Sequence, residues 1–342
     1  MPDKATISHK IASIAACLLA ISCSAEEDNK IERQAADGPA ESELATPVSA
    51  GADAGWKLVW AEEFDGEAID AASWNFVEDC WGGGNNERQC YTARASNAAI
   101  EDGKLVITAR KEPFTGFALP EHLRASAADP NGQRTQSFTS ARLTTKGKKS
   151  WRYGLFEVRA RLPQGQGTWP AIWMLPEDDA YGSWAASGEI DILEAVNLGV
   201  DCESCEEGGE NTILGTLHFG GQQPDNDMHS TEISYPAVID SGFHTFGLIW
   251  SQDAFTWTVD GVPFASAEKG DWFSAGSQNP SAPFDRPFHL ILNLAIGGGL
   301  SEKRALGGVD EIGFPKRLEV DWVRVWQCGA DPVSDNGCDR VG

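Results

Sequence analysis

Residues 188–194 read Gly-Glu-Ile-Asp-Ile-Leu-Glu and place three carboxyl groups within six positions. Acidic and aliphatic residues alternate at the start of this stretch, as they do in a β-strand with one polar and one apolar face. On such a strand Glu189 and Asp191 share a face. Glu194 is an odd number of positions away from Glu189, so a regular strand would turn its side chain into the core. We therefore predict a one-residue bulge near residues 192–193, which returns Glu194 to the carboxyl face.

Two interpretations of this acidic stretch are open on the pattern alone. Alternating acidic residues on a strand are usually the solvated face of a sheet. The alternative is a catalytic strand, in which Glu189 and Glu194 do acid/base and nucleophilic work and Asp191 lies between them. The sequence on either side of the stretch favours the catalytic interpretation.

From residue 56 onwards the chain predicts an all-β domain. Short segments with strand patterns recur, turn residues separate them, and no long helical pattern is evident. Asp260 and Gly261 lie between two of these segments and predict a hairpin. The clearest predicted strands are residues 104–111, 138–146, 153–162, 255–259, 262–265, 289–296 and 318–326. Many short strands with Gly, Pro and Asp turns indicate an antiparallel β-sandwich.

Tryptophan usage points to a sugar ligand. The chain has 13 tryptophans, and several lie beside polar, glycine-rich sequence. An indole ring offers a flat apolar face and a polar N–H group, which together suit the face and edge of a sugar ring. We predict sugar contacts for Trp173 and Trp184, and we predict that Trp257, Trp322 and Trp326 are core residues.

The charge balance narrows the class of partner. The net charge of −24, from 27 basic and 51 acidic residues, argues against nucleic acid or an anionic membrane surface as a partner. A neutral polymer such as a glucan would not be repelled.

Residues 1–23 predict an export signal. An apolar run at residues 11–21 follows a weakly basic start, and this run is shorter than the ~20 residues that a membrane-spanning helix needs. The sequence Leu-Ala-Ile-Ser-Cys ending at Cys23 resembles a bacterial lipoprotein signal with Cys23 as the lipidated residue, and an ordinary cleaved signal is the alternative. Residues 24–54 predict a flexible acidic linker. We expect an exported protein that is either anchored in the outer membrane as a lipoprotein or periplasmic or secreted.

Six cysteines follow the predicted signal. Export favours disulfides, and local pairs such as Cys328–Cys338 are the simplest prediction. Cys202 and Cys205 form a C-x-x-C motif in an acidic loop, without the second ligand pair that a zinc site needs. We therefore predict a loop disulfide there.

Residues 189–194 match the signature of glycoside hydrolase family 16, in the bulged form of its laminarinase-like members. Further segments resemble the family in the same order along the chain. They are residues 58–66, 85–89, 91–92, 161–163, 169–176, 215–218, 243–246, 293–298 and 320–326. The resemblance covers nearly all of residues 56–327. We therefore identify a catalytic domain at residues 55–328 and a C-terminal tail at residues 329–342.

This resemblance implies a fold and a mechanism. The fold is a concanavalin A-like β-jelly roll with a substrate cleft on its concave sheet, and catalysis needs no cofactor. Glu189 resembles the nucleophile of a retaining glycosidase, Glu194 the general acid/base and Asp191 the assisting carboxylate. Three neighbouring carboxyl groups repel one another when ionised, so we expect a proton to be held near neutral pH, and we assign it to Glu194.

The same resemblance implies binding residues. Positions similar to sugar-binding residues of the family are Asn85, Asn86, Glu87, Arg142, Trp169, Trp173, Trp184 and His218. A structural Asn-rich turn, a surface arginine and a core histidine stay open as alternatives. Family members often carry a structural calcium held largely by backbone carbonyl groups. The similar positions here are Glu63 and Gly103, with the side chain of Asp321.

The predicted substrate is a laminarin-type β-1,3-glucan, and we expect a monomer. A mixed-linkage β-1,3-1,4-glucanase, a galactanase and a transglycosylase are alternatives of the same enzyme class. The competing class is a non-catalytic β-glucan-binding protein. Such proteins typically lose the catalytic glutamates, whereas this sequence contains all three carboxyl groups.

Overall fold

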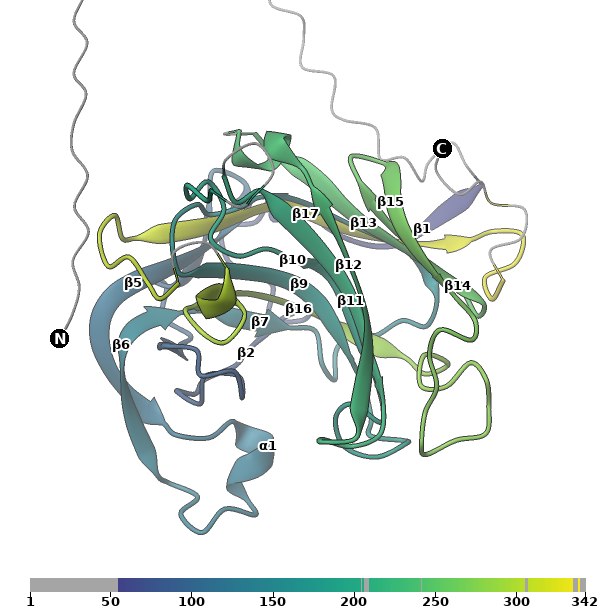
Figure 1. Cartoon of the computed structure of the whole chain (residues 1–342), viewed down its shortest axis with the longest axis horizontal. Coiled ribbons are helices and arrows are strands. Elements are labelled where there is room, and N and C mark those ends of the chain that lie inside the picture. Colours follow the sequence, from purple (N-terminus) through teal and green to yellow (C-terminus); the bar gives the residue numbers. More distant parts are fainter. Residues whose placement is uncertain are drawn as a thin grey trace, which may run out of the picture. The chain divides into compact units, whose positions relative to one another are not determined.

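The computed structural model describes residues 55–203, 205, 209–240, 242–304, 307–334 and 338. These residues form two β-sheets that pack face to face as two layers (Figure 1). The predicted β-sandwich is confirmed. The predictions for residues 1–54, including lipidation at Cys23, lie outside the described residues. No helix in the described part of the chain is long and apolar enough to cross a membrane.

The first sheet has seven strands. They are β2 (Asn75–Phe76), β7 (Arg142–Thr144), β9 (Thr168–Pro176), β10 (Glu189–Glu194), β11 (Thr212–Gly220), β12 (Asn226–Ser234) and β16 (Phe288–Ile296). Their order across the sheet is β12-β11-β10-β9-β16-β7-β2, so β10 lies between β9 and β11.

The second sheet has ten strands. They are β1 (Trp56–Glu62), β3 (Gln89–Tyr91), β4 (Ala98–Glu101), β5 (Lys104–Phe117), β6 (Gln133–Ser140), β8 (Gly154–Arg161), β13 (His244–Trp250), β14 (Ala254–Val259), β15 (Val262–Glu268) and β17 (Lys316–Cys328). Their order is β15-β14-β13-β8-β17-β5-β6-β3, with β1 paired to β17 and β4 paired to β5. The predicted hairpin at Asp260–Gly261 is the connection between β14 and β15.

Helical structure in the described residues is limited to short segments. They are α1 (Glu121–Arg124), η3 (Pro236–Ile239) and η4 (Ser301–Lys303). Helix α1 lies between β5 and β6, at the end of the long hairpin that these strands form (Figure 1).

The apolar core fills the space between the sheets. Ile190 and Leu193 of β10 belong to the same buried cluster as Leu248 of β13 and Trp257 of β14. Burial of one such side chain contributes ~1.5–3 kcal/mol to the free energy of unfolding. Because side chains alternate along a strand, the seven-stranded sheet also has a face turned away from this core, which we call the open face.

The predicted strand at residues 138–146 is in fact two strands. Strand β6 ends at Ser140 and pairs with β5 in the ten-stranded sheet, whereas β7 begins at Arg142 and pairs with β16 in the other sheet. Ala141 between them is fully buried. The chain therefore crosses from one sheet to the other within a run of strand-forming residues, and a local pattern does not reveal such a crossing.

The prediction that Trp322 is a buried core residue is confirmed, although its side chain lies outside the main apolar cluster that contains Val320. The pairing of β17 with β8 passes from Val320 to Trp322, so Asp321 is an extra residue and the alternation of faces changes there. Val323 joins Val320 in the core as a result. Trp322 packs against Arg324, whose guanidinium carbon lies 4.1 Å from the ring centroid.

The other two core predictions for tryptophan are confirmed. Trp257 is fully buried in the main cluster, and Trp326 is buried in a smaller cluster. That smaller cluster also contains Trp56 and the disulfide Cys328–Cys338. The C-terminal tail is therefore fastened to the domain at Cys338.

The disulfide predictions are confirmed. Cys202 pairs with Cys205, and Cys328 pairs with Cys338. The remaining pair, Cys80–Cys90, is local as well, with a sequence separation of 10.

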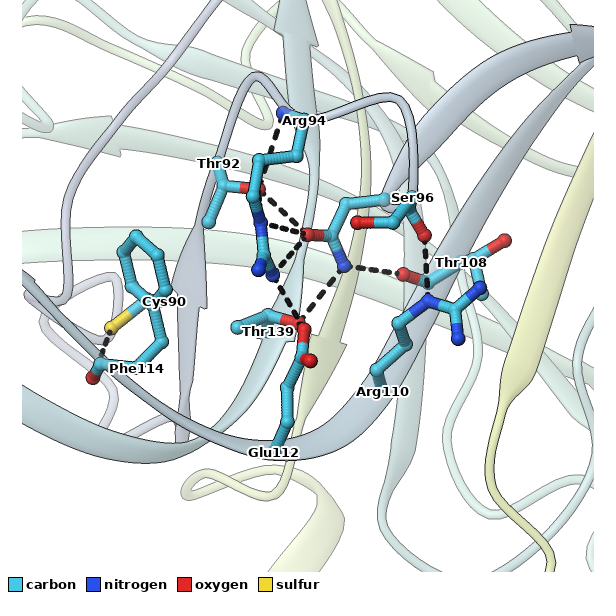
Figure 2. Close-up of polar contacts among 10 residues, drawn as sticks. Cys90, Thr92, Arg94, Ser96, Thr108, Arg110, Glu112, Phe114 and Thr139 are labelled. Atoms are coloured by element: carbon cyan, nitrogen blue, oxygen red, sulfur yellow. Dashed lines mark hydrogen bonds and ion pairs between the residues drawn. The ribbon is translucent and has the colours of Figure 1, made fainter.

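A buried asparagine links the β5–β6 hairpin to the segment before β4, and Figure 2 shows its partners. Asn97 Nδ2 donates to the Thr108 carbonyl at 2.9 Å and to the Thr139 hydroxyl at 3.0 Å. Asn97 Oδ1 accepts from the Thr92 hydroxyl and from Arg94 Nη2, each at 2.7 Å. The asparagine thereby joins three separate segments of the chain.

Substitution Asn97→Ala should lower the free energy of unfolding by about 2 to 3 kcal/mol, because it leaves buried polar groups without partners. Urea denaturation measures this loss. The matched control is Ser96→Ala, since Ser96 is exposed and its backbone carbonyl, not its side chain, accepts from Arg110. Equal destabilisation by the two substitutions would contradict the prediction.

Candidate active site

Strand β10 carries the predicted bulge. Against β9, Asp191 lies opposite Trp173 and Leu193 lies opposite Ile172, so Ile192 is the extra residue. The pairing of β10 with β11 is irregular at the same place. All three apolar residues of the strand are in the core, and its carboxyl groups lie on the open face.

Glu189 has two neighbours at the start of β10. The Trp184 indole Nε1 donates to Glu189 Oε2 at 2.9 Å. His218 lies directly opposite Glu189 on β11, and its Nε2 is 3.7 Å from Glu189 Oε1. The Trp184 side chain is 37% exposed, and its ring centroid lies 5.6 Å from that of His218. An exposed aromatic surface therefore borders this carboxyl group.

Glu194 has a matching indole donor at the other end of the strand. Trp169 Nε1 on β9 donates to Glu194 Oε1 at 2.9 Å. Trp169 is buried and packs with Val196 and Ala295. Each of the two glutamates thus accepts one hydrogen bond from an indole.

Asp191 is almost completely buried, with 2% of its surface exposed. Its Oδ2 lies 3.3 Å from His218 Nε2 and makes no hydrogen bond to the described residues. One ligand-type atom from each of Glu189, Asp191 and His218 lies within 4.8 Å of the others. The structure therefore brings these three predicted residues into one compact group.

Burial is the main electrostatic influence on the carboxyl groups. It raises the pKa of Glu189, Asp191 and Glu194 to about 8 each. Repulsion from Asp191 raises the pKa of both glutamates further, whereas His218 lowers them. The direction of these pKa shifts agrees with the expectation that a proton is held near neutral pH. Its attribution to like-charge repulsion is corrected, because desolvation is the larger cause.

The buried Asp191 should make the domain less stable as pH rises. Its pKa is raised from 3.8 to about 8, so the folded state binds this proton more tightly than the unfolded state does. The resulting stabilisation is complete below the unfolded pKa and is lost as pH rises through the folded pKa. Substitution Asp191→Asn should therefore raise the Tm, relative to the unsubstituted protein, more at about pH 9 than at about pH 5.

Thermal denaturation at the two pH values measures this effect. The exposed Asp65 is a suitable control position. The substitution Asp65→Asn should change the Tm little and by the same amount at both pH values. A pH-independent effect of Asp191→Asn would contradict the assignment.

Arg142 and Trp173 extend the site across the open face. The Arg142 guanidinium carbon lies 4.6 Å from the Tyr91 ring centroid and 5.2 Å from the Trp173 ring centroid. Trp173 Nε1 donates to Asn293 Oδ1 at 2.7 Å, and Asn293 lies opposite Arg142 on the neighbouring strand. Trp173 also lies opposite Asp191 in the pairing of β9 with β10. The row formed by Trp173, Arg142 and Asn293 therefore begins next to the Asp191 carboxyl group.

The three predicted binding residues at positions 85–87 differ in exposure. Asn85 and Asn86 are exposed. Glu87 is buried, and its Oε2 accepts from Gln89 Nε2 at 2.6 Å and from the Tyr91 hydroxyl at 3.3 Å. The structure therefore gives Glu87 a position that supports Tyr91, rather than one that is free to meet sugar hydroxyls.

Two residues of the site, Tyr91 and Asn293, are absent from the predicted set. The sequence does hold a signal for each. Glu87, Gln89 and Tyr91 have the spacing of one strand face, and Asn293 is a single polar residue inside an aliphatic run. A buried polar residue in such a run needs a hydrogen-bond partner, which here is Trp173.

The predicted calcium positions lie near the part of β17 where its pairing with β5 ends and its pairing with β1 begins. Strand β1 pairs with β17 up to Glu62, which lies opposite Val323 and directly precedes Glu63. Strand β5 pairs with β17 from Leu105, which lies opposite Val320 and is two residues after Gly103. The Asp321 carboxylate, however, pairs with Arg159, and the Glu63 carboxylate pairs with Arg324. The ligands predicted at Glu63 and Gly103 are backbone carbonyl groups, which these ion pairs do not involve, so calcium binding stays a prediction.

Comparison with known proteins agrees with this geometry. Residues 85–324 match the family model for glycosyl hydrolases family 16. A glucan endo-1,3-beta-glucosidase of Cryptopygus antarcticus is 41% identical over 277 residues, which cover 79% of this chain and 92% of that protein. The laminarinase of Rhodothermus marinus, solved by X-ray crystallography, superposes with a TM-score of 0.63 at 37% identity, covering 79% of this chain and 97% of that chain.

One relative is much longer than this chain. Glucan endo-1,3-beta-glucosidase A1 of Niallia circulans is 37% identical over 295 residues, which cover 83% of this chain but 39% of that protein. The chain thus spans less than half of that relative. The family match, the identity to these proteins and the shared fold lead to one conclusion: the chain belongs to glycosyl hydrolase family 16 and is a glycoside hydrolase.

Proposed function

We propose that the protein is an exported, retaining endo-β-1,3-glucanase that hydrolyses laminarin-type glucans. The bulged strand β10 carries this proposal, because it turns Glu189, Asp191 and Glu194 to one face and each glutamate accepts an indole hydrogen bond. The names of the relatives support β-1,3-glucan as the substrate. The presence of all three carboxyl groups favours an enzyme over a glucan-binding protein.

In the first half-reaction, ionised Glu189 attacks the anomeric carbon while Glu194 donates its proton to the glycosidic oxygen. The bond between that carbon and that oxygen breaks, one part of the glucan leaves, and the other part is held as an ester on Glu189. The Trp184 N–H group and His218 both lower the pKa of Glu189 against the effects of burial and of Asp191. They thereby favour the ionised form that attacks.

In the second half-reaction, Glu194 is ionised and takes a proton from water, and the water oxygen attacks the same carbon. Glu189 leaves as a carboxylate, and two inversions give net retention. The Trp169 N–H group stabilises ionised Glu194 between the two steps. Asp191 assists because its repulsion raises the pKa of Glu194, which makes Glu194 a stronger base.

The aromatic residues support sugar binding on either side of the carboxyl groups. Trp184 is exposed beside Glu189, and Trp173 lies next to Asp191 with Arg142 against its ring. Flat rings beside polar groups match the faces and hydroxyl edges of a glucan chain. The contacts of the substrate with these residues remain part of the proposal.

A product analysis with the full-length protein tests the proposed function. The protein is incubated with laminarin, lichenan, agarose and carrageenan, and the products are sized by chromatography. We expect oligosaccharides from laminarin, with a first-formed product of retained anomeric configuration in the NMR spectrum. Cleavage confined to lichenan would favour a mixed-linkage enzyme, and cleavage of agarose or carrageenan a galactanase. No product from any of the four would favour a binding protein.

We also propose export with Cys23 as a lipid anchor, supported by the apolar run at residues 11–21 and the Leu-Ala-Ile-Ser-Cys sequence. Labelling of the expressed protein with a fatty acid tests this, with Cys23→Ser as the control. A soluble, unlabelled protein would favour the ordinary cleaved signal.

A further inference from the structure

A core tryptophan reaches the catalytic strand from the opposite sheet. Trp257 on β14 is fully buried, and its Nε1 donates to the backbone carbonyl of Asp191 at 2.9 Å. Asp191 is the last regularly paired residue before the bulge at Ile192. The acceptor therefore lies where the bulge disrupts the ladder of strand hydrogen bonds, and a buried carbonyl group at such a place needs a donor.

Gly215 provides the space for this hydrogen bond. It lies on β11 between Thr216, which is opposite Asp191, and Leu214, which is opposite Glu194. A Cβ atom on Gly215 would lie 2.4 Å from Cδ1 and from Nε1 of Trp257. A residue with a side chain at this position would therefore displace the indole from the bulge.

Neighbouring rings hold the indole in its orientation. The Phe255 ring stacks on Trp257 with centroids 6.0 Å apart and an interplanar angle of 25°. The His229 ring lies 6.5 Å away at 15°. A ring packed in this way directs its N–H group along a fixed line, so the position of the Asp191 carbonyl is fixed as well.

We propose that Trp257 is a positioning residue, which holds the β10 bulge in the register that presents Glu189 and Glu194 together. Gly215 contributes by leaving free the space that the Trp257 indole occupies. This inference rests on the proposed function, because it concerns the relative placement of the two catalytic carboxyl groups. Without the N–H group, the carbonyl must find another donor, and the backbone between the two glutamates must move. A misplacement of ~1 Å costs on the order of 10²-fold in rate.

The main test compares two buried tryptophans of the same core. Trp257→Phe keeps an aromatic ring but removes the donor. Trp250→Phe is the matched control, because Trp250 is also buried and its Nε1 has no hydrogen-bond partner in the part of the chain that the structure describes. For laminarin hydrolysis, kcat should fall about 10- to 100-fold in the Trp257 variant while KM changes by less than about twofold. The Trp250 variant should lose less than about twofold in kcat.

Further variants address folding and the role of Gly215. All variants are assayed well below the Tm that circular dichroism gives for each. If Trp257→Phe does not fold, benzothienylalanine at position 257 replaces the N–H group by sulfur in a ring of nearly the same shape, and it should show the same loss of kcat. Gly215→Ala should also lower kcat, because it displaces the indole.

Two outcomes would overturn the positioning role: an equal kcat in the Trp257 and Trp250 variants, or an unchanged kcat with benzothienylalanine. The variant Glu189→Gln separates this inference from the proposed function. If Glu189→Gln is inactive while Trp257→Phe matches its control, only the positioning role fails. If Glu189→Gln remains active, the catalytic assignment fails first.

Discussion

Substitution Glu189→Gln should lower kcat for laminarin by on the order of 10⁴-fold or more, because an amide cannot form the glycosyl ester on which both half-reactions depend. Glutamine has nearly the size of glutamate, and its carbonyl oxygen can still accept from Trp184, as Glu189 does at 2.9 Å. The variant should therefore fold. Initial rates of reducing-end formation measure the loss. The exposed Glu302 serves as the control, and Glu302→Gln should keep full activity.

A smaller substitution distinguishes the nucleophile from a merely structural carboxylate. In Glu189→Gly the missing side chain leaves room for azide, which can attack the anomeric carbon directly once a substrate with a good leaving group is bound. Azide should restore part of the activity and give a glycosyl azide of inverted configuration, because only one displacement occurs. Full activity of the glutamine variant, or a rescued product of retained configuration, would rule out Glu189 as the nucleophile.

The second largest effect is expected for Glu194→Gln, which should lower kcat for laminarin by about 10²- to 10⁴-fold through the loss of the general acid/base. Burial, repulsion from Asp191 and the remaining neighbours together raise the pKa of Glu194 to about 8. The acid must be protonated for the first half-reaction, so activity of the unsubstituted enzyme should fall as pH rises through about 8. The glutamine variant should lose this alkaline limb, and pH–rate profiles of the two proteins measure the difference.

An activated substrate provides the control for this assignment. An aryl glycoside with a good leaving group needs little protonation, so its first half-reaction should be nearly normal in Glu194→Gln while the second stays slow. The covalent intermediate should then accumulate and be detectable by mass spectrometry, and KM should fall. If the variant is equally impaired on both kinds of substrate, Glu194 is not the acid.

The strand that carries the proposed catalytic residues was predictable because its information is local. Glu189, Asp191 and Glu194 lie on one strand, and the odd offset of Glu194 together with the aliphatic residues between them indicated a bulge before any pairing was known. The hairpin at Asp260 was predictable for the same reason, since its turn residues sit between two strand patterns. Local patterns do not reveal the crossing between sheets within residues 138–146 or the bulge at Asp321, because neither changes the composition of the strand.

The parts of the site that depend on distant contacts were not accessible from local patterns. The hydrogen bond from Trp257 to Asp191 joins residues 66 positions apart. The hydrogen bond from Arg142 Nη2 to the Tyr91 hydroxyl joins residues 51 positions apart. The balance between desolvation and charge repulsion likewise depends on how deeply the folded chain buries each carboxyl group, and no spacing of residues expresses that depth.

The two ends of the sandwich lie side by side, with Trp56 paired to Cys328 and the Gly329 amide donating to the Gly55 carbonyl at 3.2 Å. Both ends belong to the ten-stranded sheet, whereas the carboxyl groups of Glu189, Asp191 and Glu194 lie on the other sheet. The described domain therefore begins and ends on the sheet that does not carry these carboxyl groups. The same arrangement makes the domain a good subject for circular permutation, since a short linker can join its ends. Joining the two ends and opening the chain elsewhere should therefore leave the active site unchanged.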